Sequence, residues 1–253
     1  MSLVRVDHVS FGYTSDRRIL DDVSLEIASG DTIGLVGESG SGKTTLLRLL
    51  LGLARPDAGT ITFGGQPLDP GVSAFMRDFR RQAQVVFQDP YSSLDPRQTV
   101  FSIIAEPLRS LRIPGDHAKM VGDALDAVGL DRDVAKRYPH QFSGGQRQRV
   151  AIARAVVPGP RLLLADEAVS ALDLTTRTRI VDLLASLSKT MSLLFVSHDI
   201  GVVAALCRRI VILEKGRVVE TGATADVLAN PKHPYTQRLL ASVPRLRSNE
   251  VSS

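Results

Sequence analysis

The chain has 253 residues, of which 43% are hydrophobic and 23% are charged, an ordinary composition for a folded globular protein with a sizeable core. Its first residues lack the apolar stretch of a secretory signal, and no apolar run reaches the length of about 18 residues that spans a bilayer. The formal net charge of +4 comes from scattered residues, so we expect no nucleic-acid partner. Cys207 is the only cysteine, which excludes an intrachain disulfide and agrees with a reducing cytoplasm.

The first third of the chain combines strand patterns with one helix pattern. Apolar patterns predict strands of an edge sheet at residues 4–9 and 23–27, and buried strands at 32–36 and 84–87. The apolar run of residues 44–53 predicts a largely buried helix. The order of strand, glycine-rich loop and helix between residues 32 and 53 is the context that a phosphate-binding loop requires.

The middle of the chain becomes helical and is punctuated by prolines. We predict that residues 88–160 form a helical subdomain inserted into the sheet domain. The bare apolar runs at 162–165 and 193–196 then predict parallel strands that are covered on both faces.

The C-terminal part of the chain contains a hairpin pattern and a tail. Residues 210–213 and 217–220 flank Glu214, Lys215 and Gly216, and predict a closing hairpin. Short helices and a tail are expected from residue 224 onward. The predicted fold is an α/β protein with a sheet core over 1–87 and 161–223, a helical subdomain over 88–160 and a C-terminal extension over 224–253.

A glycine-rich loop follows the strand predicted at 32–36 and reads Gly37, Glu38, Ser39, Gly40, Ser41, Gly42, Lys43 and Thr44. It matches the phosphate-loop pattern in full, whereas a chance glycine turn would not be followed by an acidic strand end. Its glycines allow the positive backbone angles that turn several N–H groups toward one anion, and the following helix adds its dipole. We expect Lys43 to bridge the β- and γ-phosphates of ATP, Thr44 to ligate Mg²⁺, and Thr45 to contact the nucleotide.

Two carboxylates end the strand predicted at 162–165. Asp166 and Glu167 lie where a nucleotide carried by a neighbouring helix would be bound. Asp166 can hold the Mg²⁺ shell through water, and Glu167 can polarise the attacking water. The alternative is a pair of residues that only cap the next helix, and the glycine-rich loop favours the catalytic interpretation.

A second candidate phosphate segment consists of Ser143, Gly144, Gly145 and Gln146, directly before a helix pattern. Ser143 is a natural N-cap residue, so the segment could be a plain helix start. Two adjacent glycines are costly at an ordinary start, however, and bring bare backbone close to another group. A γ-phosphate would fit as that group.

Together the loop, the segment 142–146 and the acidic strand end resemble the nucleotide-binding subunit of an ABC transporter, over nearly the whole chain. The resemblance implies a RecA-like ATP core with an antiparallel edge sheet and an inserted helical subdomain. It also implies two such domains that enclose two ATP molecules head to tail. Each site would combine the phosphate loop of one partner with Ser143–Gln146 of the other.

The resemblance assigns roles to four further residues, each of which would alone be an ordinary structural residue. Tyr13 resembles the aromatic residue that stacks on adenine, and Gln88 resembles the glutamine that reaches the metal at the subdomain hinge. Asp173 ends a segment similar to the one that crosses the dimer interface. His198 matches the histidine that contacts the γ-phosphate.

Two positions depart from the family pattern. Ala168 stands where a proline usually follows the catalytic glutamate, which bears on the rigidity of the turn and not on the carboxylate chemistry. Phe142 replaces the commoner leucine, at a position where the backbone carries the function.

Two segments resemble the peptide and nickel importers within the family, namely 87–97 and 230–240. The second would alone be an ordinary surface helix. Several oligopeptide members carry a cysteine cluster beyond this point, and its absence here favours nickel or a metal chelate as cargo over di- or oligopeptides. The five histidines are dispersed, so we expect the chain itself not to bind the cargo.

The resemblance also implies partners and a location. We expect a second ATPase subunit, for which the resemblance favours a related chain and a second copy is the alternative. Two membrane permeases and, indirectly, an extracytoplasmic solute-binding protein are also expected. The chain would lie peripherally on the cytoplasmic face of the inner membrane. The alternatives are an ABC ATPase not coupled to transport and a module that binds ATP without hydrolysing it, which the intact Gln146, Glu167 and His198 disfavour.

Overall fold

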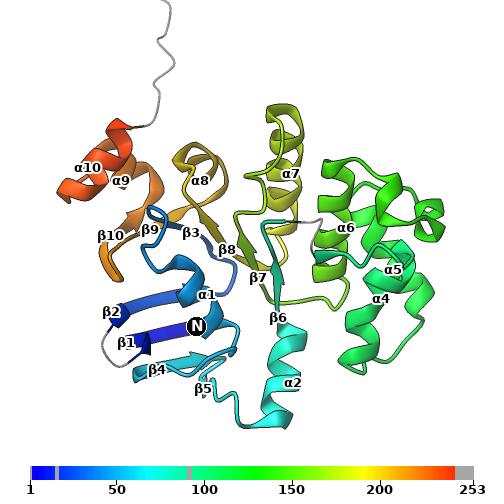
Figure 1. Cartoon of the computed structure of the whole chain (residues 1–253), viewed down its shortest axis with the longest axis horizontal. Coiled ribbons are helices and arrows are strands. Elements are labelled where there is room, and N and C mark those ends of the chain that lie inside the picture. Colours follow the sequence, from blue (N-terminus) through cyan, green and yellow to red (C-terminus); the bar gives the residue numbers. More distant parts are fainter. Residues whose placement is uncertain (1, 15–16, 90–92, 243–253) are drawn as a thin grey trace, which may run out of the picture.

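The computed structural model describes residues 2–14, 17–89 and 93–242, and these form two sheets with helices around them (Figure 1). A four-stranded antiparallel sheet has the order β2-β1-β4-β5, and a six-stranded sheet has the order β10-β9-β3-β8-β7-β6. In the larger sheet only β10 runs antiparallel to its neighbour. The predicted α/β class and the antiparallel edge sheet are therefore confirmed.

The strands have the following bounds: β1 Ser2–Thr14, β2 Arg17–Ala28, β3 Thr32–Val36, β4 Ala58–Phe63, β5 Gln66–Pro67, β6 Ala83–Val86, β7 Leu162–Asp166, β8 Ser192–Ser197, β9 Arg209–Glu214 and β10 Arg217–Ala223. The apolar runs of β3 and β8 are buried along their whole length, as expected for parallel strands covered on both faces. Lys215 and Gly216, with φ values of 48° and 80°, close the β9–β10 hairpin in the positive-φ conformation that two-residue turns favour.

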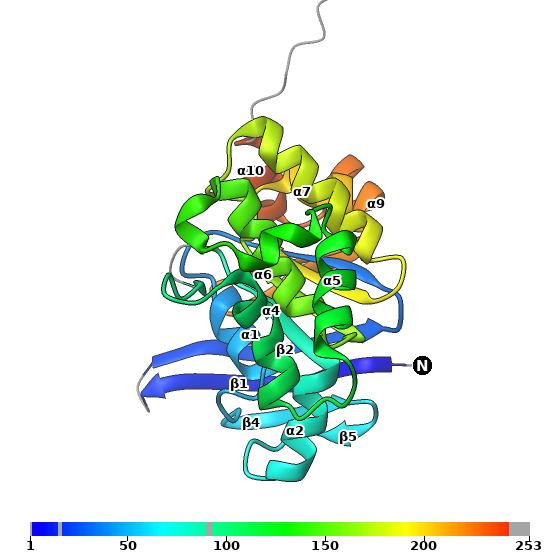
Figure 2. The same cartoon turned by 90° about the vertical axis from the view of Figure 1, so that its right-hand side faces the viewer.

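The α-helices have the following bounds: α1 Lys43–Leu50, α2 Ser73–Gln82, α4 Val100–Ser110, α5 His117–Ala127, α6 Gly144–Val156, α7 Leu174–Leu187, α8 Ile200–Leu206, α9 Thr224–Ala229 and α10 Pro234–Ala241. Two 3-10 turns, Arg132–Lys136 and Pro139–Gln141, precede α6. Helices α4, α5 and α6 lie beyond the β6 edge of the larger sheet (Figures 1 and 2), whereas α9 and α10 lie at its β10 edge.

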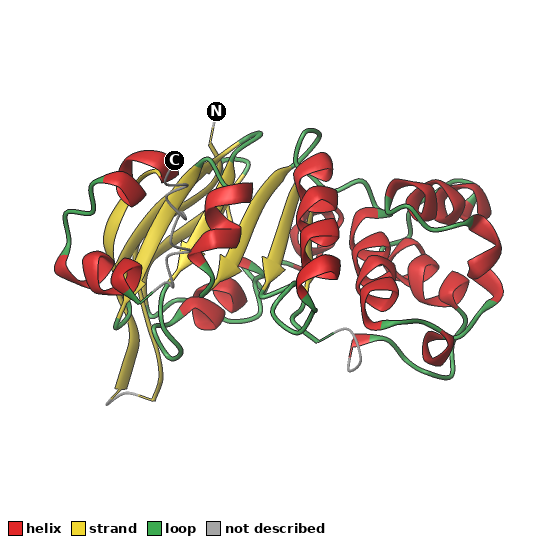
Figure 3. Ribbon diagram, turned by 90° about the horizontal axis from the view of Figure 1, so that it is seen from above, coloured by secondary structure: helices red, strands yellow, loops and turns green. Residues whose placement is uncertain are grey.

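Alternate residues of the central strands belong to two different cores. Leu194 and Val196 of β8 pack in the core that contains α1 and the smaller sheet, whereas Leu193 and Phe195 pack in the core shared with α6 and α8. This is the two-residue period of a strand that is buried on both sides. Figure 3 shows the strands in the middle of the molecule and the α4–α6 group at one end.

One helix ends earlier than predicted. The helix expected over 44–53 spans Lys43–Leu50, with Leu51 as its C-cap. Gly52 follows with a φ of 63°, the left-handed conformation that commonly terminates helices. The apolar run continues to Leu53, but the glycine ends the helical backbone before it.

Candidate functional site

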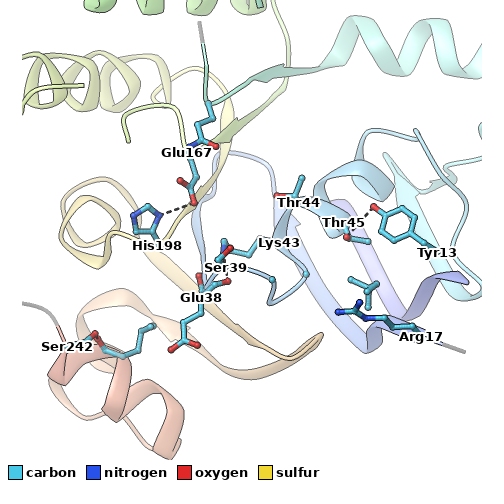
Figure 4. A pocket seen from close by; sticks show the side chains of 16 residues that line it. Tyr13, Arg17, Glu38, Ser39, Lys43, Thr44, Thr45, Glu167, His198 and Ser242 are labelled. Atoms are coloured by element: carbon cyan, nitrogen blue, oxygen red, sulfur yellow. Dashed lines mark hydrogen bonds and ion pairs between the residues drawn. The ribbon is translucent and has the colours of Figure 1, made fainter. Parts of the chain in front are cut away.

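A cavity of about 830 Å³ opens where the glycine-rich loop meets the ends of β7 and β8 (Figure 4). Most of the residues that were assigned to the nucleotide line it: Tyr13, Gly37, Glu38, Ser39, Gly40, Gly42, Lys43, Thr44, Thr45, Gln88, Glu167 and His198. Four lining residues were not predicted, namely Arg17, Ile19, Leu239 and Ser242. Segments from both ends of the chain thus meet at one cavity.

The glycine-rich loop has the backbone of an anion cradle. Gly40 and Gly42 have φ values of 80° and 108°, and Gly42 is the N-cap of α1. A Cβ atom at Gly37 would lie 2.2 Å from the carbonyl oxygen of Leu213, so a side chain does not fit at this position. Lys43, Thr44 and Thr45 of the first turn of α1 line the cavity. The N–H groups at the start of a helix have no intrahelical acceptors, which favours a bound phosphate there.

The ammonium group of Lys43 lies folded back on this loop. Its Nζ atom donates to the carbonyl oxygens of Gly37, at 2.6 Å, and Glu38, at 2.8 Å. Burial lowers the pKa of Lys43, and the negative charges of Glu167, Asp166 and Glu38 oppose that effect. A phosphate in the cradle would offer the ammonium group a stronger, charged acceptor than the two carbonyl groups.

The acidic strand end places one carboxylate beside an imidazole. Glu167 follows β7 with a φ of 46°, and its N–H donates to the carbonyl oxygen of Val196 at 2.9 Å. The Glu167 Oε1 atom lies 3.0 Å from Nδ1 of His198, which donates because an ionised carboxylate can only accept. Burial, followed by the charge of Glu167, raises the pKa of Asp166.

The residues present fit a magnesium ion. Thr44, Gln88 and Asp166 supply hydroxyl, amide and carboxylate oxygens, the hard donors that Mg²⁺ prefers. Gln88 donates its Nε2 to the Ser170 hydroxyl at 3.3 Å, so its amide oxygen is the atom suited to a metal. Among the described residues no group of three or more His, Cys, Asp or Glu could hold a metal. Such a cluster is not needed, because Mg²⁺ at nucleotide sites is held largely by phosphate and water.

Tyr13 presents an exposed aromatic ring at the cavity. Its side chain is held from one side by Phe11, in an edge-on contact at 5.1 Å between ring centroids. Its hydroxyl lies 3.4 Å from Oγ1 of Thr45 and accepts a bond from Arg48 at 3.3 Å. Tyr13 remains 57% exposed, which leaves ring surface on which a base can stack. The guanidinium carbon of Arg48 lies over the ring, 5.9 Å from its centroid.

Seven predicted site residues do not line the cavity: Ser41, Ser143, Gly144, Gly145, Gln146, Asp166 and Asp173. Ser143 and Gln146 form a reciprocal capping box at the start of α6, with bonds of 3.3 Å and 3.0 Å, and Asp173 caps α7. A Cβ atom at Gly145 would lie 2.3 Å from Cγ2 of Thr176. The Thr176 side chain of the same chain therefore already lies close to the Gly145 backbone. The sequence had led us to expect a phosphate as the group close to this glycine.

The two departures from the family pattern lie in packed surroundings. Ala168 is 1% exposed and Phe142 is 6% exposed, and both belong to the core that includes α6. Ala168 therefore fills a buried position directly after Glu167.

Ser41 of the glycine-rich loop is also buried, and its hydroxyl has no hydrogen-bond partner among the described residues.

Comparisons with known proteins agree with this geometry. A family model described as "ABC transporter" matches residues 20–170, and one described as "Oligopeptide/dipeptide transporter, C-terminal region" matches residues 219–251. The chain is 47% identical over 235 residues to the glutathione import ATP-binding protein GsiA of Escherichia coli (strain K12) and of Salmonella typhimurium. These matches cover 91% of this chain but 38% of the relatives' own length.

Solved structures show the same fold. CbiO1 from Clostridium perfringens, part of the ABC transporter complex CbiONQ, matches with a TM-score of 0.81 and 28% identity over 90% of this chain and 91% of that one. The ATP-binding cassette MJ0796, solved as a dimer in a post-hydrolysis state with ADP and Pi, matches with a TM-score of 0.77 and 29% identity. That match covers 87% of this chain and 98% of the other.

The fold and the site define an ATP-binding cassette protein with a phosphate loop and an acidic strand end. The chain belongs to the ABC transporter family, and within it the C-terminal match groups the chain with the ATP-binding subunits of the peptide type. The predicted family membership is thereby confirmed. No helix in the described part of the chain is both long and apolar enough to cross a membrane.

Proposed function

We propose that this chain binds and hydrolyses ATP in order to power the import of short peptides. The observation that carries the proposal is the convergence of Lys43, Glu167 and His198 on one cavity, next to the cradle of the phosphate loop. Each of these side chains suits a different part of the reaction. Their arrangement is that of a phosphoryl-transfer site, in which positioning and charge do most of the work.

The residues act in sequence on the bound triphosphate. The N–H groups of the loop hold the β-phosphate, and Lys43 leaves its two carbonyl acceptors to bridge the β- and γ-phosphates. Glu167 accepts a proton from the water whose oxygen attacks the γ-phosphorus, the bond from this phosphorus to the bridging oxygen breaks, and ADP and inorganic phosphate leave. His198 orients the Glu167 carboxylate and contacts the γ-phosphate. A Mg²⁺ ion, bound through Thr44, Gln88 and Asp166, would neutralise charge on the phosphate oxygens. Tyr13 stacks on the adenine ring.

A partner completes the site in this proposal. Ser143, Gly144, Gly145 and Gln146 would contact the γ-phosphate held by a second ATPase subunit, and Asp173 would lie at the interface. These residues do not line the cavity of their own chain, which supports this arrangement, as does the dimeric form of the related MJ0796 cassette. The second subunit is a related chain or a second copy. Two permeases and an extracytoplasmic solute-binding protein would complete the transporter at the cytoplasmic face of the membrane.

The three parts of the chain have separate tasks. Residues 1–87 and 161–223 bind ATP, and 88–160 transmit closure of the dimer to the permeases. Residues 224–253 extend the core. The hinge between the first two parts includes Gln88, which is bonded to Ser170 just after the acidic strand end. Residues 90–92 of the importer-like segment 87–97 lie outside the described residues.

The C-terminal segment supports the proposed cargo. Its match to oligopeptide and dipeptide transporters, together with relatives that import glutathione, supports a short peptide in preference to nickel or a metal chelate. The same C-terminal match disfavours an ABC ATPase that is not coupled to transport.

Replacement of the base tests the catalytic part of the proposal. Glu167→Gln retains the shape of the side chain but cannot accept the proton, so we expect hydrolysis to fall by about a hundredfold or more while ATP still binds. Mixed with its second subunit, the variant should elute as a dimer in size-exclusion chromatography with ATP and as monomers without it. Lys43→Ala serves as the control that loses ATP binding. Undiminished hydrolysis by Glu167→Gln would refute the assigned base.

Transport of candidate cargo tests the rest. The chain is reconstituted in liposomes with its permeases and second subunit, and uptake of labelled di-, tri- and oligopeptides and of nickel is compared. We expect ATP-dependent uptake of a peptide, which Glu167→Gln abolishes. Uptake of nickel alone would overturn the proposed cargo but leave the ATPase assignment intact.

A further inference from the structure

The C-terminal helix touches the phosphate loop directly. The backbone N–H of Glu38 donates to the hydroxyl oxygen of Tyr235, in α10, at 2.9 Å, although the two residues are 197 positions apart in the sequence. Tyr235 is 3% exposed, and burial raises its pKa, so its hydroxyl remains neutral at physiological pH. Leu239 of α10 and Ser242, the C-cap of this helix, line the same cavity. Figure 4 shows Ser242 beside the loop that carries Glu38. The C-terminal segment therefore forms one wall of the nucleotide site.

The bond from Glu38 acts on one particular peptide group. The carbonyl of Gly37 and the N–H of Glu38 belong to the same planar peptide unit. Lys43 Nζ holds its carbonyl end at 2.6 Å, and Tyr235 holds its N–H end at 2.9 Å. Once Lys43 turns to a phosphate, the bond to Tyr235 still restrains the orientation of this peptide. A peptide that cannot rotate keeps the loop in its binding conformation.

Helix α10 is itself anchored to the sheet and can therefore act as a fixed support. Arg238 Nη2 lies 3.3 Å from Oε1 of Glu214, at the end of β9. The carboxylate of Glu220 in β10 accepts bonds from the N–H groups of Lys232, at 2.8 Å, and His233, at 3.1 Å, just before α10 begins. Both anchors come from the β9–β10 hairpin.

The same hairpin holds the other part of the loop. The N–H of Gly216, in the hairpin turn, donates to the carbonyl oxygen of Ser41 at 2.9 Å. The phosphate loop is thus hydrogen-bonded to Tyr235 near its start, at Glu38, and to Gly216 near its end, at Ser41. These two contacts fix the loop against one rigid unit formed by β9, β10 and α10.

We propose that Tyr235 is a positioning residue of the nucleotide site, which fixes the Gly37–Glu38 peptide so that the phosphate loop is formed before the nucleotide arrives. The proposal rests on the proposed function, in that the cavity must bind a nucleotide. It gives the C-terminal segment a task within ATP binding. The affinity for nucleotides then depends on the hydrogen bond between Glu38 and Tyr235. Tyr235 belongs neither to the phosphate loop nor to β3 and α1, which flank the loop.

The test uses the full chain with a single hydroxyl removed. Tyr235→Phe keeps the buried ring and loses only the acceptor for Glu38, so a loop that must order on binding should bind more weakly. We expect the Kd for Mg²⁺–ADP, measured by isothermal titration calorimetry, and the KM for ATP to rise about fivefold. The value of kcat should stay within about twofold, because Tyr235 contacts no reacting atom. Tyr138→Phe, which removes an exposed hydroxyl, is the matched control and should leave both constants unchanged.

The outcomes separate this proposal from the proposed function. Unchanged Kd and KM in Tyr235→Phe, with ADP binding still lost in Lys43→Ala, would overturn the role of Tyr235 and leave the nucleotide site intact. Binding that persists in Lys43→Ala would overturn the proposed function itself. A lower melting temperature of Tyr235→Phe with an unchanged Kd would show a purely structural contact and would also overturn the proposal. All titrations are made well below the melting temperature of each variant.

Discussion

The imidazole Nδ1 of His198 lies 3.0 Å from Oε1 of Glu167, although the two residues follow different strands and are 31 positions apart. The contact arises because β7 and β8 are parallel neighbours, with Asp166 opposite Val196, so that both strand ends reach the same edge of the sheet. It gives the carboxylate a defined orientation before any substrate binds. This relationship predicts how hydrolysis depends on His198.

Replacement of His198 by alanine is expected to lower kcat for ATP hydrolysis by about ten- to a hundredfold, because Glu167 loses its orienting donor. Because His198 is also proposed to contact the γ-phosphate, the KM for ATP should rise as well, but by less than kcat falls. His198→Gln retains an N–H donor and should recover part of the activity. A steady-state comparison of the three proteins checks this, and equal kcat values for the wild type and His198→Ala would contradict the role of the imidazole.

Loss of the aromatic ring at Tyr13 should weaken nucleotide binding. Tyr13→Ala removes the stacking surface, worth about 1–3 kcal/mol per base on aromatic platforms, and we expect the Kd for ATP to rise about tenfold or more. Tyr13→Phe keeps the ring and loses only the long contacts to Thr45 and Arg48, so its Kd should stay within about threefold. Fluorescence titration with a labelled ATP measures both, and equal affinities for the alanine variant and the wild type would exclude stacking.

A methyl group at Gly145 should destabilise the chain through Thr176. In Gly145→Ala the new Cβ would lie 2.3 Å from Cγ2 of Thr176, and overpacking of this kind costs about 1–3 kcal/mol. Thr176→Ser removes that methyl group while keeping the hydroxyl, so the double variant should regain most of the lost stability. Chemical denaturation of the isolated chain gives the free energies of unfolding. No rescue by Thr176→Ser would contradict the steric cause.

The thiol of Cys207 should be unreactive in the folded chain. Burial raises its pKa to about 12, so thiolate is scarce at pH 8, and the side chain is only 5% exposed. We expect a disulfide reagent to label it only after unfolding by guanidinium. Because the pKa of Cys207 is higher in the folded chain than in the unfolded chain, its contribution to the free energy of unfolding is complete at pH values below the unfolded pKa. This contribution is lost as pH rises toward 12, where the unfolded thiol ionises more readily than the folded one. Stoichiometric labelling of the native chain at pH 8 would contradict this prediction.

The parallel strands could be predicted because their apolar runs admit few other structures. Residues 162–165 and 193–196 lie within β7 and β8, and residues 32–36 coincide with β3. Helix α2, at Ser73–Gln82, was not predicted, because it carries several charged residues and most of its side chains are polar. Its buried Met76 and Phe79, three positions apart, were the available signal.

The phosphate loop and the acidic pair followed from the sequence alone, because each lies in one contiguous segment whose residue types are dictated by local backbone chemistry. Glycines at 40 and 42 turn the loop, and Asp166 and Glu167 end a buried strand. Only the tertiary structure decided that Glu167 meets His198 and that Tyr235 reaches the N–H of Glu38. These contacts depend on the order of strands in the sheet and on where α10 packs, which no local pattern determines.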